Sequence, residues 1–269
     1  MYNDSFKIRF KKAPIAVSET VWEDTLNHIH KEFEIILVLS GSARIKTGVD
    51  EFTACKGDMI FVNPMEVHSI YPNKDESYLH RCVCFDLSLV SDTQISSSFA
   101  DGSLTAVHII KSDRTGYLSD IFQKLFSVAE SCEETLPLEA GAYVSLIFAH
   151  MIKNGAVSGK SRTGKKSDFY FKVMQYISEN YASDISSLDP ATEMFYTQSH
   201  FCRTFAKNFG IPFSAFLNIY RINKAKELLE NSNEKISDVA AGCGFTNFSY
   251  FTKCFRKYVG MSPSEYRKY

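Results

Sequence analysis

Two short stretches near the carboxyl end combine small polar side chains with single basic ones. They contain Gln198, Ser199, Cys202 and Arg203, and then Phe248, Ser249, Thr252 and Lys253. Side chains of these types can approach the donors and acceptors on base edges in the major groove of a duplex. Basic residues near each stretch could position the chain on phosphates, namely Lys207, Lys224, Arg256 and Lys257.

The distribution of charge along the chain singles out the same region. The whole chain has 30 Lys and Arg against 31 Asp and Glu. Residues 1–90 contain 10 basic and 13 acidic residues, whereas residues 196–269 contain 11 basic and 5 acidic residues, a balance of +6. A basic module on a neutral chain is typical of polyanion binding, because Lys and Arg near phosphates release counterions. A solvated basic face gives the same balance, so charge alone leaves both interpretations open.

The C-terminal region repeats itself with an offset of 50 residues. The identical pairs in this register are Ser199/Ser249, Phe201/Phe251, Phe205/Phe255, Lys207/Lys257, Gly210/Gly260 and Ser214/Ser264. Upstream the match slips by one residue, so that Asp189 corresponds to Asp238, which indicates an insertion in a turn. The region therefore contains a duplicated structural unit.

Each copy is expected to form a short helix, a turn and a longer helix. In the second copy, Ser237 can cap a short helix, and Gly244 supplies the left-handed residue that ends it. Thr246 or Asn247 then caps a longer helix that Gly260 ends.

The first copy follows the same plan, with Thr197 as the cap of a helix to about Asn208 and Gly210 as its terminator. The segment from Ser214 to Leu229 is expected to be a helix that holds the copies at a fixed separation. This pattern predicts two helix-turn-helix motifs. The alternative is a helical bundle in which the repeated phenylalanines are only core.

The residues from Arg221 to the end read RINKAKELLENSNEKISDVAAGCGFTNFSYFTKCFRKYVGMSPSEYRKY. With the preceding residues from Asp184, this stretch resembles the DNA-binding domain of the AraC/XylS family of bacterial transcription regulators. In that family two recognition helices enter successive major grooves on one face of DNA. By position, the resemblance implies that the base-facing side chains are Ser199, Cys202, Arg203, Phe248, Ser249, Tyr250, Thr252 and Lys253. Ser187 and Pro190 depart from the family pattern, which prefers apolar residues there, although a first helical turn tolerates proline.

Residues 1–90 are expected to form a barrel or sandwich of short strands. The β-type segments are residues 35–39, 43–47, 59–62 and 80–87, separated by turns with Gly or Pro. The same region contains His28, His30, Glu34 and His68, with Gly41, Gly57 and Pro64 between them.

This spacing resembles the cupin motif, whose two histidines, glutamate and later histidine hold a metal inside a small barrel. Imidazole and carboxylate ligands suit Fe, Mn, Ni or Zn. Two departures argue against metal here: the interval from Pro64 to His68 is one residue shorter than in the enzyme motif, and Glu66 replaces a glycine.

We therefore expect a metal-free effector pocket, since AraC/XylS regulators commonly carry such a domain without metal to hold a small molecule, often a sugar. The candidate effector-binding residues are His28, His30, Glu34, Arg44, His68 and Tyr71. Planar polar groups beside aromatic rings suit a sugar or polyol, and an amino acid or small acid would also fit.

Two amphipathic helices are expected over residues 117–130 and 138–153, where they could pack on the barrel or pair between subunits. We predict a homodimer, because it brings four recognition helices to repeated half-sites. The Gly, Ser and Lys content of residues 154–167 predicts a flexible linker. The predicted parts are thus an effector-binding barrel (1–90), a helical dimerisation segment (91–153), the linker (154–167) and a DNA-binding domain (168–269).

Composition is that of a soluble protein, with 269 residues, 45% hydrophobic and 23% charged. No apolar run reaches the roughly 20 residues of a membrane helix, and the amino terminus lacks a signal pattern, so a cytoplasmic location is expected. The 7 cysteines include no C-x-x-C pair, which argues against a disulfide framework or a thiolate zinc site.

These patterns predict a multidomain α+β protein with a cupin-like β-barrel at its amino end and an all-α domain with two helix-turn-helix motifs at its carboxyl end. The predicted partners are double-stranded DNA, a small-molecule effector, a second copy and RNA polymerase, and neither catalytic residues nor a cofactor are expected. The competing interpretation is a cupin metalloenzyme, such as a dioxygenase or sugar isomerase, with a basic helical appendage. A sequence-independent architectural DNA binder is the third interpretation.

Overall fold

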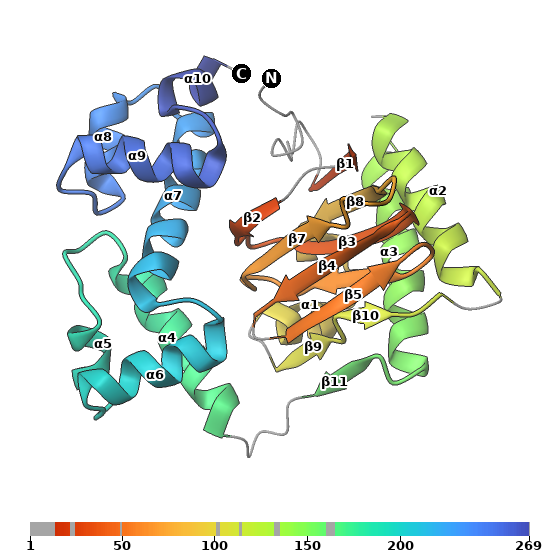
Figure 1. Cartoon of the computed structure of the whole chain (residues 1–269), viewed down its shortest axis with the longest axis horizontal. Helices are drawn as coiled ribbons and strands as arrows, with labels where there is room; N and C mark the ends of the chain where they lie inside the picture. The colour runs from red at the N-terminus through yellow and green to blue at the C-terminus, as the bar shows by residue number, and fades with distance from the viewer. Residues whose placement is uncertain are drawn as a thin grey trace. The chain divides into compact units, whose positions relative to one another are not determined.

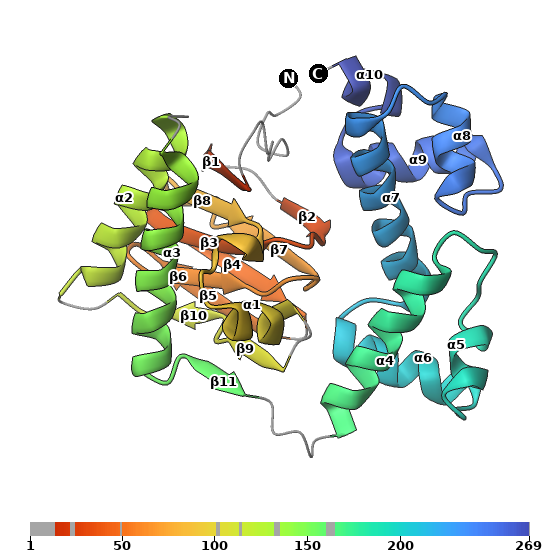
Figure 2. The same cartoon turned by 180° about the vertical axis from the view of Figure 1, so that it is seen from behind.

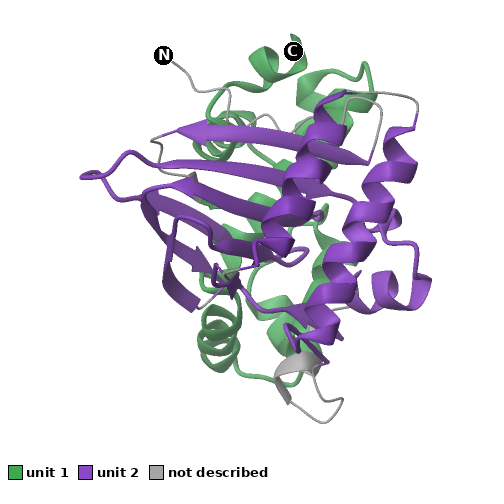
Figure 3. Cartoon of the chain, turned by 90° about the vertical axis from the view of Figure 1, so that its right-hand side faces the viewer, with its two compact units in different colours: residues 1–2, 26–29, 168–269 green, residues 3–25, 30–167 purple. Residues whose placement is uncertain are grey.

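The computed structural model describes residues 14–21, 25–48, 50–100, 103–112, 115–131, 135–159 and 165–268. The chain divides into two compact units (Figure 3). Among the described residues, unit 1 contains residues 26–29 and 168–268, and unit 2 contains the remainder up to residue 167. The predicted fold class is confirmed, because the amino-terminal region is rich in strands and the carboxyl-terminal region is helical (Figure 1).

Strands from the amino-terminal half form two larger sheets and one small one. The five-stranded sheet has the order β1-β8-β3-β6-β10, the four-stranded sheet has the order β2-β7-β4-β5, and β11 pairs with β9. The strands are β1 (Ile15–Val21), β2 (Thr25–His28), β3 (Phe33–Ser40), β4 (Ser42–Thr47), β5 (Asp50–Cys55), β6 (Met59–Val62), β7 (His68–Pro72), β8 (Leu79–Phe85), β9 (Leu104–Ala106), β10 (Ile109–Ile110) and β11 (Val157–Gly159).

Strand β3 is buried on both faces and separates two hydrophobic cores. Phe33, Ile35 and Leu37 belong to one core, whereas Ile36 and Val38 belong to the other, as the alternation of side chains in a strand requires. The second core is shared by residues of both larger sheets. Because Glu34 is in phase with Ile36, its carboxylate is directed to the side of this second core.

Two helices cover the outer face of the five-stranded sheet (Figure 2). They are α2 (Tyr117–Ser131) and α3 (Leu136–Lys153), close to the predicted ranges, and the shorter α1 (Thr93–Ala100) precedes them. Aromatic rings join these layers, since the Phe148 ring centroid lies 5.2 Å from that of Phe33 and 5.0 Å from that of Phe99. This face of the sheet is therefore closed by helices.

The segment predicted as a linker is shorter than expected. Val157, Ser158 and Gly159 form β11 and pair in register with β9, and helix α4 (Lys165–Asn180) begins before the predicted end of the linker. Backbone pairing rather than composition decides the structure of residues 157–159. The rest of the predicted linker, residues 160–164, lies outside the described residues.

Unit 1 contains the two predicted motifs on a common helix. The first motif is α5 (Leu188–Glu193) and α6 (Gln198–Phe209), and the second is α8 (Ile236–Gly242) and α9 (Phe248–Val259). Helix α7 (Phe213–Asn231) joins them, and α10 (Pro263–Lys268) follows the second motif (Figure 1).

The capping residues of α6 and α9 confirm the predicted helix boundaries. The Thr197 hydroxyl accepts a hydrogen bond from the backbone N–H of His200, and the Asn247 carboxamide oxygen accepts one from that of Tyr250. Both helices end at a left-handed glycine, Gly210 in the first motif and Gly260 in the second.

The predicted cap of α8 was wrong. Ser237 lies inside the first turn and donates its hydroxyl to Asp238, while Lys235 occupies the cap position. The carbonyl of Lys235 already accepts from the backbone N–H groups of Asp238 and Val239, so the helix begins earlier than predicted.

A buried arginine joins the start of the first motif to α7. The Arg221 Nε and Nη2 atoms donate to the carbonyl oxygens of Tyr181 and Ser183, each at 2.7 Å. Arg221 is only 8% exposed, so its charge depends on these carbonyl dipoles and contributes little to a basic surface. Gly244 packs against one of these carbonyls, because a Cβ atom there would lie 2.5 Å from the Tyr181 oxygen.

We predict that Gly244→Ala destabilises the chain more than Gly260→Ala does. The two glycines have nearly the same φ, +83° and +80°, so both variants incur the left-handed penalty of about 1–2 kcal/mol. Only the Gly244 variant also meets the Tyr181 carbonyl, whereas nothing lies within 4 Å of a Cβ at Gly260. Urea unfolding followed by circular dichroism measures the difference, and equal losses would show that the contact with Tyr181 is unimportant.

Candidate functional site

The exposed sides of the two longer helices carry most of the predicted contact residues. In α6, Ser199, Cys202 and Arg203 are exposed, whereas Phe201 and Phe205 are buried. In α9 the same helical period buries Phe251 and Phe255 and exposes Phe248, Ser249, Tyr250 and Lys253, with Thr252 half-buried. Gln198, Lys207, Arg256 and Lys257 are exposed as well. The phenylalanines of the repeat are thus core, and the polar sides remain accessible.

Part of the exposed side of α6 and one exposed residue of α9 border one hollow of about 650 Å³. Cys202 and Arg203 of α6, Leu217 and Asn218 of α7, and Tyr250 of α9 line it. The Asn218 amide donates to the Tyr250 hydroxyl at 2.9 Å and so connects α7 to α9. The hollow therefore lies between α6, α7 and the start of α9 within unit 1.

Some basic residues of the region have structural partners. Arg221 is buried, and the Lys224 ammonium lies 3.0 Å from a carboxylate oxygen of Glu227. Lys224, predicted to contact phosphate, is therefore less available than Lys207 or Lys257. Asn218 was not predicted, because its importance comes from a contact with a residue 32 positions away.

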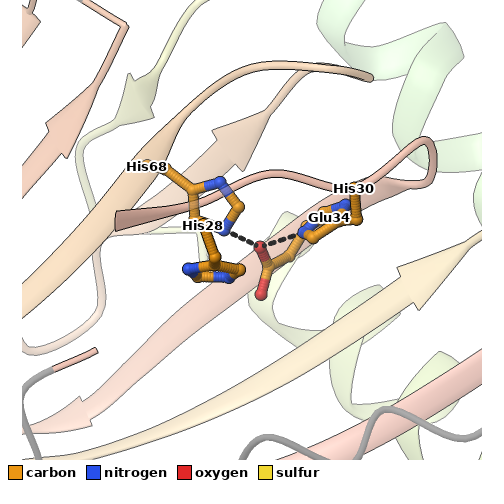
Figure 4. A group of neighbouring side chains, drawn as sticks. All are labelled: His28, His30, Glu34 and His68. Carbon is orange, nitrogen blue, oxygen red and sulfur yellow. Dashed lines mark hydrogen bonds and ion pairs between the residues drawn. The ribbon is translucent and has the colours of Figure 1, made fainter. Parts of the chain in front are cut away.

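In unit 2, a carboxylate and two imidazoles meet at the end of the second core, which contains Ile36 and Val38 (Figure 4). Glu34 Oε2 lies 3.2 Å from His30 Nε2 and 2.9 Å from His68 Nε2. His28 offers a further ligand atom, and all four ligand atoms lie within 4.8 Å of one another. The structure thus brings together the four side chains that the motif predicts.

Three members of this cluster, His30, His68 and Glu34, each have a further hydrogen bond that orients them. His30 Nδ1 lies 3.0 Å from the carbonyl oxygen of Glu32, and His68 Nδ1 lies 3.0 Å from that of Glu66. The Cys82 thiol donates to Glu34 Oε1 at 2.7 Å. Cys82 comes from β8, far away in sequence, and was not predicted.

The electrostatics of the cluster follow from burying one carboxylate. Burial alone would raise the pKa of Glu34, but the charge of His68 and the hydrogen bonds from His30 and His68 hold this pKa well below its ordinary value. Burial opposes the charged form of His30, but the hydrogen bond and charge of Glu34 outweigh it and raise the His30 pKa. Burial raises the pKa of Cys82 to about 12, so its thiol remains a proton donor.

Glu66, which replaces a glycine of the motif, stabilises the site from outside the cluster. Its carboxylate accepts from the Asn63 amide at 3.1 Å and lies 2.9 Å from His108 Nε2. The other ring nitrogen of His108 lies 2.9 Å from Asp50 Oδ2. These contacts fix the Glu66 backbone, whose carbonyl in turn orients His68.

Arg44 and Tyr71 do not join the cluster, which corrects the prediction that they line the same pocket. They are partners in the register of β4 and β7, and the Arg44 guanidinium lies 4.9 Å from the centre of the Tyr71 ring. His68 and Ile70 point to the inner face of β7, so Tyr71 points to the opposite face, as does Arg44. Arg44 also pairs with Glu51 at 3.1 Å.

Two family models match most of the chain. One, described as an AraC-like ligand binding domain, matches residues 18–146, and the other, a helix-turn-helix domain, matches residues 191–269. The chain belongs to the AraC/XylS family of transcription regulators. This AraC-family protein therefore combines a ligand-binding domain with a DNA-binding domain, and it is a regulator rather than a cupin metalloenzyme.

Relatives agree with this assignment. The uncharacterised HTH-type transcriptional regulator YisR of Bacillus subtilis is 24% identical, with 94% of this chain and 93% of YisR covered. YijO of Escherichia coli, another uncharacterised regulator of this type, is 35% identical, but the match covers only 46% of this chain and 44% of YijO.

Among solved structures, apo ToxT from Vibrio cholerae is similar along 97% of this chain and 99% of its own, with a TM-score of 0.61 and 15% identity. ToxT with a bound unsaturated fatty acid gives a TM-score of 0.58 at 14% identity, and covers 94% of each chain. At these identities the likeness shows the fold alone. Within the described parts of this AraC-family chain, no helix is long and apolar enough to cross a membrane.

We predict that His108 makes the stability of the chain depend on pH. Burial would lower its pKa, but the hydrogen bond and charges of Glu66 and Asp50 raise it above 6.5. Its stabilising contribution, on the order of 1 kcal/mol, is therefore complete below pH 6.5 and is lost as the pH rises through the raised pKa.

The measurement is the urea unfolding free energy of the wild type and of His108→Gln across this range. The wild type should lose more stability than the variant as the pH rises, and the difference isolates His108 from His30, whose pKa is raised in the same direction. Parallel curves for the two proteins would contradict the prediction.

Proposed function

We propose that α6 and α9 enter successive major grooves on one face of a DNA duplex and read its sequence. The observation that carries this proposal is that α6 and α9 bury their phenylalanines and expose their polar sides, while α7 packs against both helices and holds them at a fixed separation. Helix α7 has 19 residues and so is about 28 Å long, close to the roughly 34 Å between successive turns of the groove. The base-reading residues would be Ser199, Cys202, Arg203, Phe248, Ser249, Tyr250, Thr252 and Lys253, with Gln198 beside them.

The hollow itself suits the sugar-phosphate backbone that separates the two grooves. Asn218 and Ser214 place an amide and a hydroxyl at its border. Donors of these kinds hold phosphate oxygens without reading sequence. Lys207, Arg256 and Lys257 would hold phosphates at the outer ends of α6 and α9.

The small-molecule effector is proposed to bind at the cluster of His28, His30, Glu34 and His68. A buried carboxylate with two imidazoles favours a hydroxyl-rich ligand, and a sugar is the class that we favour. A bound effector would change the relative populations of DNA-binding arrangements, provided that it binds them with different affinities. ToxT, which shares the fold, is known with an unsaturated fatty acid, so a thermal-shift screen should include both classes.

We propose that the protein binds DNA as a homodimer and that helix α3 forms the contact between the two copies. Leu138, Leu146 and Ile152 of this helix are 78%, 45% and 45% exposed, and exposed Ala142 and Ala149 lie between them. Large apolar side chains on one side of a helix mark an interaction surface. RNA polymerase would be a further partner, and the cytoplasm, where the chromosome lies, would be the site of action.

We predict that Arg203→Ala and Lys253→Ala each weaken binding to the preferred operator by about 1–3 kcal/mol, because each removes a base contact. Binding to random duplex should change much less. The matched controls are Lys207→Ala and Lys257→Ala, which should weaken binding to both duplexes alike and reduce the salt dependence by about one ion each.

Fluorescence anisotropy on a duplex selected from a random pool gives these affinities. Footprints should show two protected major-groove patches on one face, roughly 34 Å apart. Equal affinity of the wild type for selected and random duplexes would instead indicate an architectural DNA binder.

We predict that Leu138→Lys combined with Leu146→Lys converts the dimer to a monomer. Two charges in an apolar contact lose their hydration without gaining partners. Light scattering after size exclusion measures the mass, and Val21→Lys, at another exposed apolar side chain, is the control. A monomeric wild type, or a double variant that stays dimeric, would exclude α3 as the interface.

A further inference from the structure

The two longer helices of the motifs begin with different side chains at equivalent positions. In the 50-residue register of the repeat, Gln198 at the start of α6 corresponds to Phe248 at the start of α9. Four residues further on, Cys202 corresponds to Thr252. Residues four apart lie on the same face of a helix, so each pair forms one small patch near the amino end of its helix. This end of a recognition helix is the part that contacts base edges.

In α9 the patch contains an apolar ring that is already in position. Phe248 is 50% exposed, and its ring centroid lies 6.0 Å from that of the fully buried Phe251. The ring therefore rests against the core of the second motif and keeps about half of its surface accessible. Contact with such a surface costs little ordering when DNA binds.

Thr252 adds a methyl group to the same patch. Its hydroxyl donates to the carbonyl oxygen of Phe248 at 3.0 Å, as the hydroxyl of a threonine inside a helix can do. The hydroxyl proton is thereby used within the helix and does not reach an acceptor on a base. What Thr252 adds to the patch is therefore its methyl group.

The equivalent patch in the first motif is polar. Gln198 Nε2 donates to the Ser187 hydroxyl oxygen at 3.0 Å, which leaves the Oε1 atom as an acceptor for a donor on a base. The thiol of Cys202 takes the place of the threonine side chain. Of the two motifs, the second is thus the one with a hydrocarbon surface at this position.

A hydrocarbon surface at the start of a recognition helix suits one group of the major groove. The C5-methyl group of thymine is the apolar feature that the bases present there, and phenylalanine and the methyl group of threonine are among its usual contacts. The other features of the base edges are hydrogen-bond donors and acceptors, which a phenyl ring and a methyl group do not satisfy.

We propose that Phe248, together with the methyl group of Thr252, reads the C5-methyl group of a thymine in the half-site bound by α9. The inference rests on the proposed function, because it requires α9 to enter the major groove. It adds the base feature that the second motif selects, a methylated pyrimidine, whereas Gln198 makes the first motif select by hydrogen bonding. Burial of one methyl group corresponds to a factor of about four in affinity.

The test removes single methyl groups from the DNA and leaves the protein unchanged. Each thymine of a duplex selected from a random pool is replaced in turn by uracil, which lacks only the C5-methyl group. Fluorescence anisotropy of the full chain should show an affinity loss of about four-fold at the thymine that Phe248 contacts. Cytosine and 5-methylcytosine at that position, each opposite guanine, should differ by a similar factor in favour of the methylated base.

Variants of the protein assign this preference to the patch. Phe248→Gln, which copies the first motif, should bind the thymine and uracil duplexes equally at that position. Thr252→Ser keeps the hydroxyl but removes the methyl group, so it should lower the preference for thymine in part. The matched control is Phe195→Gln, at a phenylalanine of the first motif that is 96% exposed, and it should retain the full preference. Circular dichroism of each variant confirms that it is folded.

Three results would overturn the inference. The first is a set of selected duplexes without an invariant thymine, and the second is a wild type that tolerates uracil at every thymine. The third is a Phe248→Gln variant that keeps the sensitivity of the wild type to uracil at every position. A failure of the proposed function is seen separately, as equal affinity of the wild type for selected and random duplexes.

Discussion

The DNA-binding unit depends on one helix that belongs to two cores at once. Helix α7 packs Phe213 and Phe216 against the phenylalanines of α6, and it packs Ile222, Ala225 and Leu229 into the core of the second motif. Neither motif can rotate about α7 without losing buried apolar contacts, which are the main favourable contribution to its folding. The relative position of α6 and α9 therefore follows from hydrophobic packing, and the polar residues only need to stay outside it.

A second constraint acts in the strand-rich unit, where a carboxylate lies at the end of an apolar core. Glu34 is 5% exposed and sits on β3, whose other inward side chains are aliphatic. A buried charge of this kind persists only when hydrogen bonds and opposite charge replace its hydration. His30 from the β2–β3 connection, His68 from β7 and Cys82 from β8 meet that requirement. The compensation of one buried charge therefore brings the polar side chains of the unit together at one place.

Local chemistry made parts of both units predictable. The limits of α6 and α9 followed from Thr197, Asn247 and two glycines, and the convergence of His28, His30, Glu34 and His68 followed from a compact motif. The sequence did not predict Cys82, Glu66 or His108 as parts of the site, because their roles arise from pairing between distant strands. The prediction that Arg44 and Tyr71 line the pocket was wrong for a related reason. The side of a sheet to which a residue points depends on register, which spacing along the chain does not reveal.

Arg221 has a consequence for the kind of operator that this protein can use. It bonds to the carbonyls that precede the first motif, and its guanidinium lies 5.8 Å from the ring of Phe245, in the turn of the second. Arg221 thus couples the two motifs, and under the proposed binding mode it holds them at a fixed spacing. Inserting a single base pair between their targets would turn one target by about 35° around the duplex axis, and such a rigid protein could not follow. Natural binding sites should therefore vary in sequence far more readily than in the spacing of their two halves.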